Sequence, residues 1–109
     1  MRKFSEQIEL ADGTIGHKFQ CPGCNMPHLI YIKSETDPMW KFNNDVEKPT
    51  LTPSVKFRLD VDPTDWTKPA KHVCHSYVTA GKIKFLSDTT HSLAGTTVDL
   101  PDWTEDMNK

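Results

Sequence analysis

The sequence predicts a small, mainly β protein, a single-domain antiparallel sheet or sandwich. Its 109 residues are enough for one domain with one core. Hydrophobic residues make up only 36% of the chain, so we expect that core to be small. No window of about 11 residues shows a helical period, whereas short β-rich runs recur between turn signals.

The expected strands follow one another along the chain. The dipeptide Asp12-Gly13, set between the segment Ile8-Glu9-Leu10 and Ile15, predicts a hairpin. The segment 55–60 alternates apolar and charged residues, which is typical of a half-buried strand. Other short strands are expected over residues 28–33, 39–42 and 96–100.

A second hairpin is predicted over residues 72–87, with Ala80-Gly81 as its turn. Pairing Thr79 with Lys82 places Cys74 on the core-facing side, because side chains alternate along a strand. The residues that share this side are Ser76, Val78, Ile83 and Phe85. His75 then lies on the opposite side of the strand.

Three segments are expected to be irregular. The prolines of residues 49–54 predict an edge connection that blocks sheet pairing. Residues 60–71 are polar and contain two prolines, so we predict an exposed loop, in which Trp66 is a candidate partner-binding residue. The domain is expected over residues 1–103, followed by an acidic tail over 104–109.

Three cysteines are present, and two of them form the motif Cys21-Pro22-Gly23-Cys24. An odd count without a signal peptide argues against a disulfide framework. Gly23 would allow a positive φ in a tight turn that aims both thiolates at one ion. A redox pair normally opens a helix, and Met26-Pro27 interrupts any helix here; simple burial of the thiols is the other alternative.

A structural zinc site needs four ligands, usually Cys or His. The favoured set is Cys21, Cys24, Cys74 and His91, which would make the fold a β-sheet or sandwich around a zinc knuckle. His75 could replace Cys74 or His91, and His28 could replace His91. Zinc joining residues 21 and 74 would close a long loop and add its binding energy to folding.

Charge and hydropathy exclude several classes of function. The longest apolar runs, such as residues 29–32, are too short for a transmembrane helix, so no membrane association is expected. The net charge of −2 does not favour nucleic acid as a partner. Nucleic acid stays a secondary alternative, because zinc knuckles can bind single strands and the chain has a modest basic cluster. This cluster comprises Lys68, Lys71, Lys82 and Lys84.

An ordered series of motifs resembles a family of small phage and prophage proteins of uncharacterised function, whose members are often labelled ammonia monooxygenase. The similarity spans about residues 19–103. Its motifs are Cys21-Pro-Gly-Cys24-x3-His28, Trp40-x-Phe42-Asn43-x-Asp45, Pro49-Thr50-x2-Pro53-Ser54, Cys74-His75-Ser76-Tyr77-Val78, Gly81-x-Ile83-x-Phe85-Leu86-x-Asp88 and His91-x-Leu93-Ala94-Gly95-x-Thr97-Val98-x-Leu100-Pro101. This chain departs from the pattern at Asn44, where the family has Gly, and at Thr89, where it often has Cys or Ser.

The resemblance implies a zinc-bound, phage-encoded accessory protein in the cytoplasm of a bacterial host. Its expected mode of action is binding to a host protein, such as a defence component. The alternative is a small zinc-dependent hydrolase-like enzyme, in which His75, Asp88 and His91 would form a polar cluster near the metal. Established zinc-enzyme signatures are missing, and so is the Gly-x-Ser-x-Gly elbow of many serine hydrolases.

Overall fold

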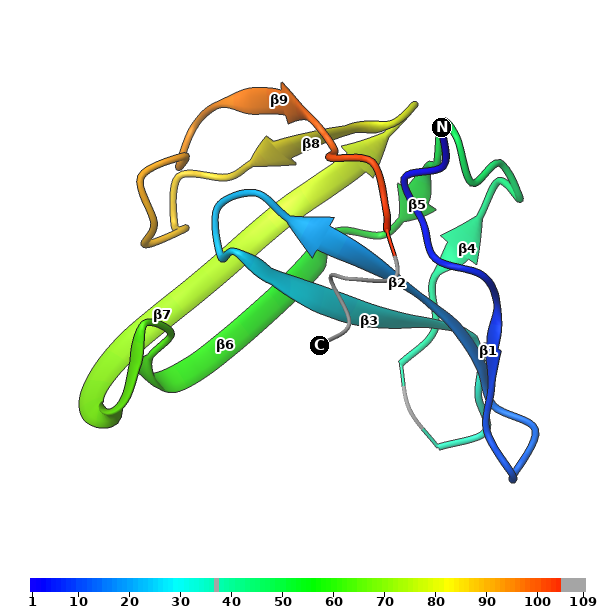
Figure 1. The fold of residues 1–109 in the computed structure, drawn as a ribbon, viewed down its shortest axis with the longest axis horizontal. Helices are drawn as coiled ribbons and strands as arrows, with labels where there is room; N and C mark the ends of the chain where they lie inside the picture. Colours follow the sequence, from blue (N-terminus) through cyan, green and yellow to red (C-terminus); the bar gives the residue numbers. More distant parts are fainter. Residues whose placement is uncertain (37, 105–109) are drawn as a thin grey trace.

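The mainly β prediction is confirmed by the computed structural model, which describes residues 1–36 and 38–104. These residues form three antiparallel sheets, ordered β1-β2-β3, β4-β5 and β6-β7-β8-β9 (Figure 1). The strands are β1 (Ile8–Glu9), β2 (Ile15–Cys21), β3 (Met26–Lys33), β4 (Lys41–Phe42), β5 (Leu51–Thr52), β6 (Val55–Asp62), β7 (Asp65–Thr79), β8 (Lys82–Phe85) and β9 (Thr97–Asp99). Within this part of the chain, no helix is long and apolar enough to span a membrane.

Both predicted hairpins are present. Strands β1 and β2 pair around the Asp12-Gly13 turn, where Asp12 Oδ1 accepts a hydrogen bond of 2.9 Å from the backbone N–H of Thr14. Strands β7 and β8 pair with Thr79 opposite Lys82, as predicted. Ala80 and Gly81 both have positive φ, which matches the twist of a two-residue hairpin turn.

The exposed loop predicted over residues 60–71 is wrong, because these residues extend β6 and β7 into a long two-stranded ribbon (Figure 1). The ribbon turns at residues 63–64, where Asp62 Oδ1 accepts hydrogen bonds from both the backbone and the hydroxyl of Thr64. The pairing is irregular around Val61, opposite Pro69, and such irregularities let a strand contain a proline. Trp66 lies in this ribbon and is 64% exposed.

The segment 49–54 is also more ordered than predicted. Leu51 is buried, and β5 pairs with β4 instead of acting only as a connection. The segment is also joined to the β7–β8 turn, since the carbonyl of Pro49 accepts from Gly81 N–H and the hydroxyl of Thr50 from Ala80 N–H. It leads directly into β6 through Ser54.

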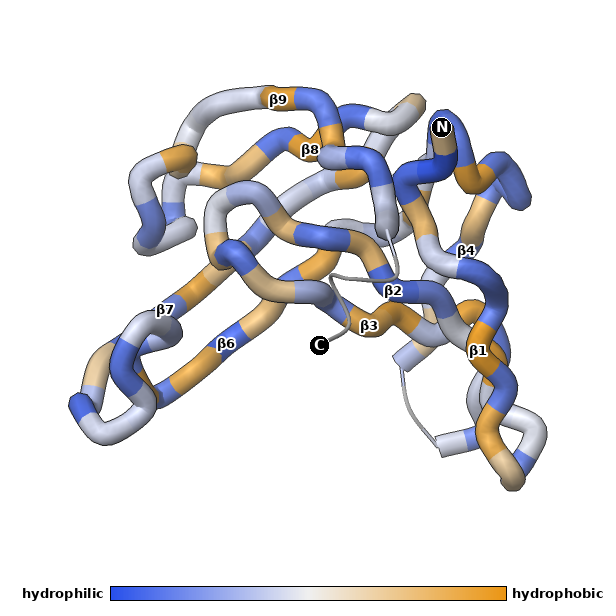
Figure 2. The backbone as a smooth tube through the Cα atoms, viewed as in Figure 1, coloured by the Kyte–Doolittle hydropathy of each residue, from blue (hydrophilic) through white to orange (hydrophobic). Residues whose placement is uncertain are grey.

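The core lies between the β1-β2-β3 sheet and one face of the β6-β7-β8-β9 sheet. Hydropathy alternates along β6 and β8, as the two faces of these strands require (Figure 2). Fully buried side chains from both sheets, together with Phe4 before β1 and Leu100 after β9, fill this core; those from the sheets are Phe19, Ile30, Val78, Ile83 and Phe85. Trp103 closes the domain, and the predicted tail over 104–109 lies, apart from Thr104, outside the described residues.

Candidate metal centre and candidate active site

The Cys21–Cys24 motif forms the connection between β2 and β3. Asn25 N–H donates to the Cys21 carbonyl over 3.0 Å, and Cys24 N–H approaches Cys21 Sγ at 3.4 Å. The positive φ of this turn belongs to Asn25, not to Gly23 as predicted. The turn brings both thiols to the same side of the β-hairpin, facing β7.

Two distant segments complete a four-residue cluster with these thiols. Cys74 lies on the core-facing side of β7, with its Sγ 3.8 Å from Cys21 Sγ, and His91 follows the turn after β8. One ligand atom from each of Cys21, Cys24, Cys74 and His91 lies within 4.8 Å of all the others. All three cysteines are buried free thiols.

Gly23 provides the space in which the His91 ring lies. A Cβ added at Gly23 would lie 2.0 Å from Cε1 of His91, a distance that no side chain can tolerate. The absence of a side chain at Gly23 therefore allows the imidazole to pack directly against the thiol turn.

The thiols of the cluster affect one another's ionisation. Hydrogen bonds from the thiols of Cys24 and Cys74 lower the pKa of Cys21, whereas the same contact with Cys21 raises the pKa of Cys24 to about 12 and also raises the pKa of Cys74. The cluster without metal therefore favours one thiolate, at Cys21. Burial lowers the pKa of His91, whose Nε2 is buried without a hydrogen-bond partner. A metal ion would provide a partner for this nitrogen and stabilise further thiolates, so the donor set fits a metal.

Two more histidines lie next to the cluster on its buried side. His72 Nε2 is 3.1 Å from Cys24 Sγ. His28 is buried with neither ring nitrogen hydrogen-bonded, and its ring packs against Phe57 at 4.3 Å between centroids. The geometry leaves His28 outside the four-residue cluster, and it leaves out His75 as well.

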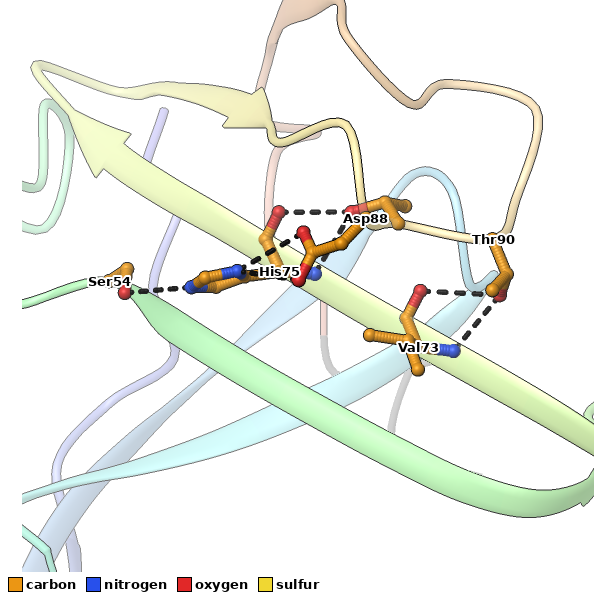
Figure 3. A network of polar contacts seen from close by, with 6 residues as sticks. Ser54, Val73, His75, Asp88 and Thr90 are labelled. Atoms are coloured by element: carbon orange, nitrogen blue, oxygen red, sulfur yellow. Dashed lines mark hydrogen bonds and ion pairs between the residues drawn. The ribbon is translucent and has the colours of Figure 1, made fainter.

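His75 takes part in a different cluster, on the opposite face of β7. Its Nε2 is 3.0 Å from Oγ of Ser54, and its Nδ1 is 3.1 and 3.2 Å from the two carboxylate oxygens of Asp88 (Figure 3). Ser54 and Asp88 thus contact the two nitrogens of one imidazole. The His75 side chain is 24% exposed and that of Asp88 is 50% exposed, so the cluster is accessible from solvent.

The pairing of β6 with β7 brings Ser54 to His75. Val55 lies opposite Ser76, so Ser54, one residue earlier, is a diagonal neighbour of His75 on the outer face. The backbone of Ser54 is held by Trp40, whose indole N–H donates to the Ser54 carbonyl over 3.1 Å. The serine therefore has a fixed position at the entrance of a regular strand.

The segment after β8 holds both Asp88 and the backbone of His75. The Thr89 hydroxyl accepts from the N–H of His75 and donates to its carbonyl, both over 3.0 Å. Thr90 makes the same pair of contacts with Val73, two residues away on the same face (Figure 3). Beyond the end of the β7–β8 pairing, the two adjacent threonines thus take over the hydrogen bonds to the backbone of β7. They also hold Asp88 beside the imidazole.

The arrangement has the chemistry of a nucleophile, a base and an orienting acid. An ionised carboxylate only accepts hydrogen bonds, so Asp88 assigns the proton of the neutral imidazole to Nδ1. The Nε2 atom of His75 is then free to accept the proton of the Ser54 hydroxyl. The order Ser54, His75, Asp88 along the chain differs from that of the familiar serine hydrolases, but such triads are recognised by geometry.

The sequence prediction anticipated part of these two sites. The structure brings together the four residues of the favoured ligand set, and it pairs His75 with Asp88. The expected grouping of that pair with His91 at the metal does not occur, because alternation along β7 turns Cys74 and His75 to opposite faces. Ser54 was missed as a functional residue, and its only sequence signal was its place in the Pro49–Ser54 motif.

Comparison with known proteins identifies a matching family. The model of the BubE family, described as bacterial ubiquitination-like system serine protease, matches residues 4–86. This range contains Ser54 and His75 but ends two residues before Asp88. No curated protein and no solved structure matches the chain.

Proposed function

Because this chain belongs to the BubE family of bacterial ubiquitination-like system serine proteases, we propose that it is itself a serine protease, with Ser54 as nucleophile, His75 as general base and Asp88 as orienting acid. The observation that carries the proposal is the unbroken set of contacts from Ser54 Oγ through the imidazole to the carboxylate. The class of protease in the family description requires an activated serine, and Ser54 makes the contacts that activation needs.

The reaction follows from these positions. Oγ of Ser54 attacks the carbonyl carbon of the scissile bond while Nε2 of His75 takes the hydroxyl proton. The carboxylate of Asp88 stabilises the imidazolium that forms. His75 then gives the proton to the leaving amine, which leaves an acyl group on Ser54, and a water molecule activated by the same imidazole hydrolyses that ester.

A fluorophosphonate probe tests the nucleophile directly, since it reacts with activated serines without needing the natural substrate. We expect one adduct per chain, mapped by mass spectrometry to Ser54. His75→Ala should lose most of the labelling, because the base is removed, while Ser87→Ala, which changes an exposed serine next to Asp88, should label normally. Labelling at another serine, or unchanged labelling of His75→Ala, would contradict the proposal.

We further propose that the four-residue cluster holds zinc in a structural role. Three thiols and one imidazole are a usual structural zinc set, and four protein ligands leave no open position for chemistry at the ion. Cys74 directly precedes His75, and His91 follows Asp88 by three residues. An ion joining Cys74 to His91 would therefore fix the two segments that carry the base and the acid.

Metal analysis of the purified protein tests this second part. We expect one zinc ion per chain and no loss of zinc in Ser54→Ala. The hypothesis of a zinc-dependent hydrolase predicts instead that His75 contributes to metal binding, so loss of zinc in His75→Ala would favour it. Binding of a host protein and a phage origin stay predictions from the sequence; a pull-down from bacterial lysate with the inactive Ser54→Ala protein tests that binding.

A further inference from the structure

A positively charged hollow lies beside the proposed catalytic residues, on the same outer face of the sheet. It has a volume of about 330 Å³ and shares Asp88 with the triad. We call it the cationic groove; its lining residues are Lys56, Arg58, Lys71, Val73, Asp88 and Thr90. Nothing in the reaction described above uses its three cations.

The register of β6 and β7 fixes the order of these cations relative to the triad. Lys56 lies two residues after Ser54 and directly opposite His75, and Arg58 lies opposite Val73. Residues two apart on a strand are about 6.7 Å apart and share one face. The positive charges therefore continue from the reacting serine along the ribbon at the spacing of alternate residues in an extended chain.

The charges of the groove are not neutralised from within. Its single carboxylate, Asp88, is already bonded to His75. Arg58 has one contact, with Asp60 at 4.0 Å, and both side chains are mostly exposed, so this pair is weak. In the described part of the chain, neither Lys56 nor Lys71 forms an ion pair. A chain with net charge −2 thus concentrates three cations beside its nucleophile.

From this arrangement we propose that the cationic groove binds acidic side chains of the polypeptide substrate, in an extended segment next to the scissile bond. The proposal rests on the proposed protease function, because the bond that Ser54 attacks then belongs to a polypeptide, and this polypeptide has to continue over the neighbouring surface. Alternate side chains of an extended segment point to one side, so acidic residues two apart would meet Lys56 and then Arg58 or Lys71.

Protection of Ser54 from the fluorophosphonate measures occupancy of the groove. The probes are two dye-labelled hexapeptides, one of alternating Glu and Gly and one of alternating Gln and Gly. We expect the Glu peptide to protect Ser54 at a concentration about fivefold lower than the Gln peptide, which corresponds to the upper range for one exposed ion pair. This difference should shrink in about 1 M salt, where the Debye length is about 3 Å.

Charge reversal separates the groove from general electrostatics. Arg58→Glu and Lys71→Glu should abolish the preference for the Glu peptide, whereas Lys33→Glu, the same change at an exposed site at the end of β3, should keep it. If Arg58→Glu slowed fluorophosphonate labelling of Ser54 but kept the preference for the Glu peptide, the proposal would be overturned. The cations would then act on Asp88 alone.

Fluorescence anisotropy of the same labelled peptides gives a second measurement that needs no reaction at Ser54. If Ser54 does not react but the Glu peptide binds more tightly than the Gln peptide, the protease function fails and the groove stands. If Ser54 reacts and both peptides bind equally, the groove fails and the protease function stands. Preferential binding of a single-stranded oligonucleotide that is lost in Arg58→Glu would assign the groove to nucleic acid and overturn the proposal.

Discussion

The two faces of β7 carry adjacent residues in opposite environments. Cys74 is 1% exposed and lies among two other thiols and an imidazole, whereas the side chain of His75 is 24% exposed beside a serine and a carboxylate. The pairing of β7 with β6 and β8 determines the side of the sheet to which each of the two side chains points. The inner cluster joins segments far apart in the chain, and the outer cluster depends on the hydroxyls and turns at the ends of the strands.

This difference teaches how a chain with a small core can hold the proposed reactive site. A reacting serine needs access to its substrate, so its neighbours cannot be fixed by burial alone. The donor set on the buried side gives the missing rigidity if it binds a metal, because metal binding contributes directly to folding. Four substitutions test whether the two faces have separate tasks.

The largest effect is expected from Asp88→Asn on the outer face. An amide at this position can donate to Nδ1 and favours the wrong tautomer of His75, so labelling of Ser54 or peptide cleavage should fall about 10⁴-fold. Metal content and thermal unfolding should stay as in the wild type, because Asp88 is half exposed and lies away from the thiols. Activity close to that of the wild type would show that the carboxylate does not orient the base.

Cys24→Ser should have the largest effect from the inner face. A serine hydroxyl is a poor ligand for a soft divalent ion, so the bound metal should be lost and the unfolding temperature should fall by more than about 10 °C. Metal analysis and calorimetry measure the two quantities. Ser92→Ala, an exposed change next to His91, is the control, and wild-type metal content in Cys24→Ser would contradict the metal site.

Gly23→Ala tests the packing of the His91 ring against the thiol turn. The added methyl group would overlap with the imidazole, so His91 has to move and metal affinity should fall about 10- to 100-fold, the range for changes in the surroundings that orient a metal ligand. Competition with a coloured chelator measures this affinity. The three thiols stay in place, so the protein should still fold; unchanged affinity would exclude His91 as a ligand.

Thr89→Val addresses the link between the two faces and has the smallest expected effect. Valine keeps the shape but leaves the N–H of His75 without its acceptor, at a cost of about 1–3 kcal/mol, whereas the His75 carbonyl still accepts from the N–H of Leu86. The unfolding temperature should fall by several degrees, and activity by about tenfold or more as His75 shifts. Thr89→Ser retains the hydroxyl and should restore both; failure to do so would argue against the hydroxyl as the positioning group.

Local patterns were sufficient to predict the hairpins and the thiol turn. The β7–β8 register follows from alternation and from one turn, so the side of Cys74 could be derived from residues 72–87 alone. The ligands of the metal site could then be chosen from a few candidates, because the chain has only three Cys and five His.

Ser54 and the ribbon could not be derived in this way. The contact between Ser54 and His75 depends on the pairing of β6 with β7, across 21 residues whose prolines indicated a loop. A serine outside a nucleophile elbow has no sequence signal of its own, and only the partner across the sheet distinguishes it from other serines. Likewise, Gly23 was interpreted through its backbone freedom, whereas its role depends on a ring 68 residues further along the chain.

The tight turn at Ala80-Gly81 has a consequence for how this chain can vary in length. Inserting or deleting a single amino acid between His75 and the turn would exchange the two sides of the strand, exposing the thiol of Cys74 to water and burying the imidazole of His75 in the interior. Both sites would be lost in one step, although every amino acid that forms them is still present. In this stretch, spacing is therefore under stronger constraint than the identity of most side chains.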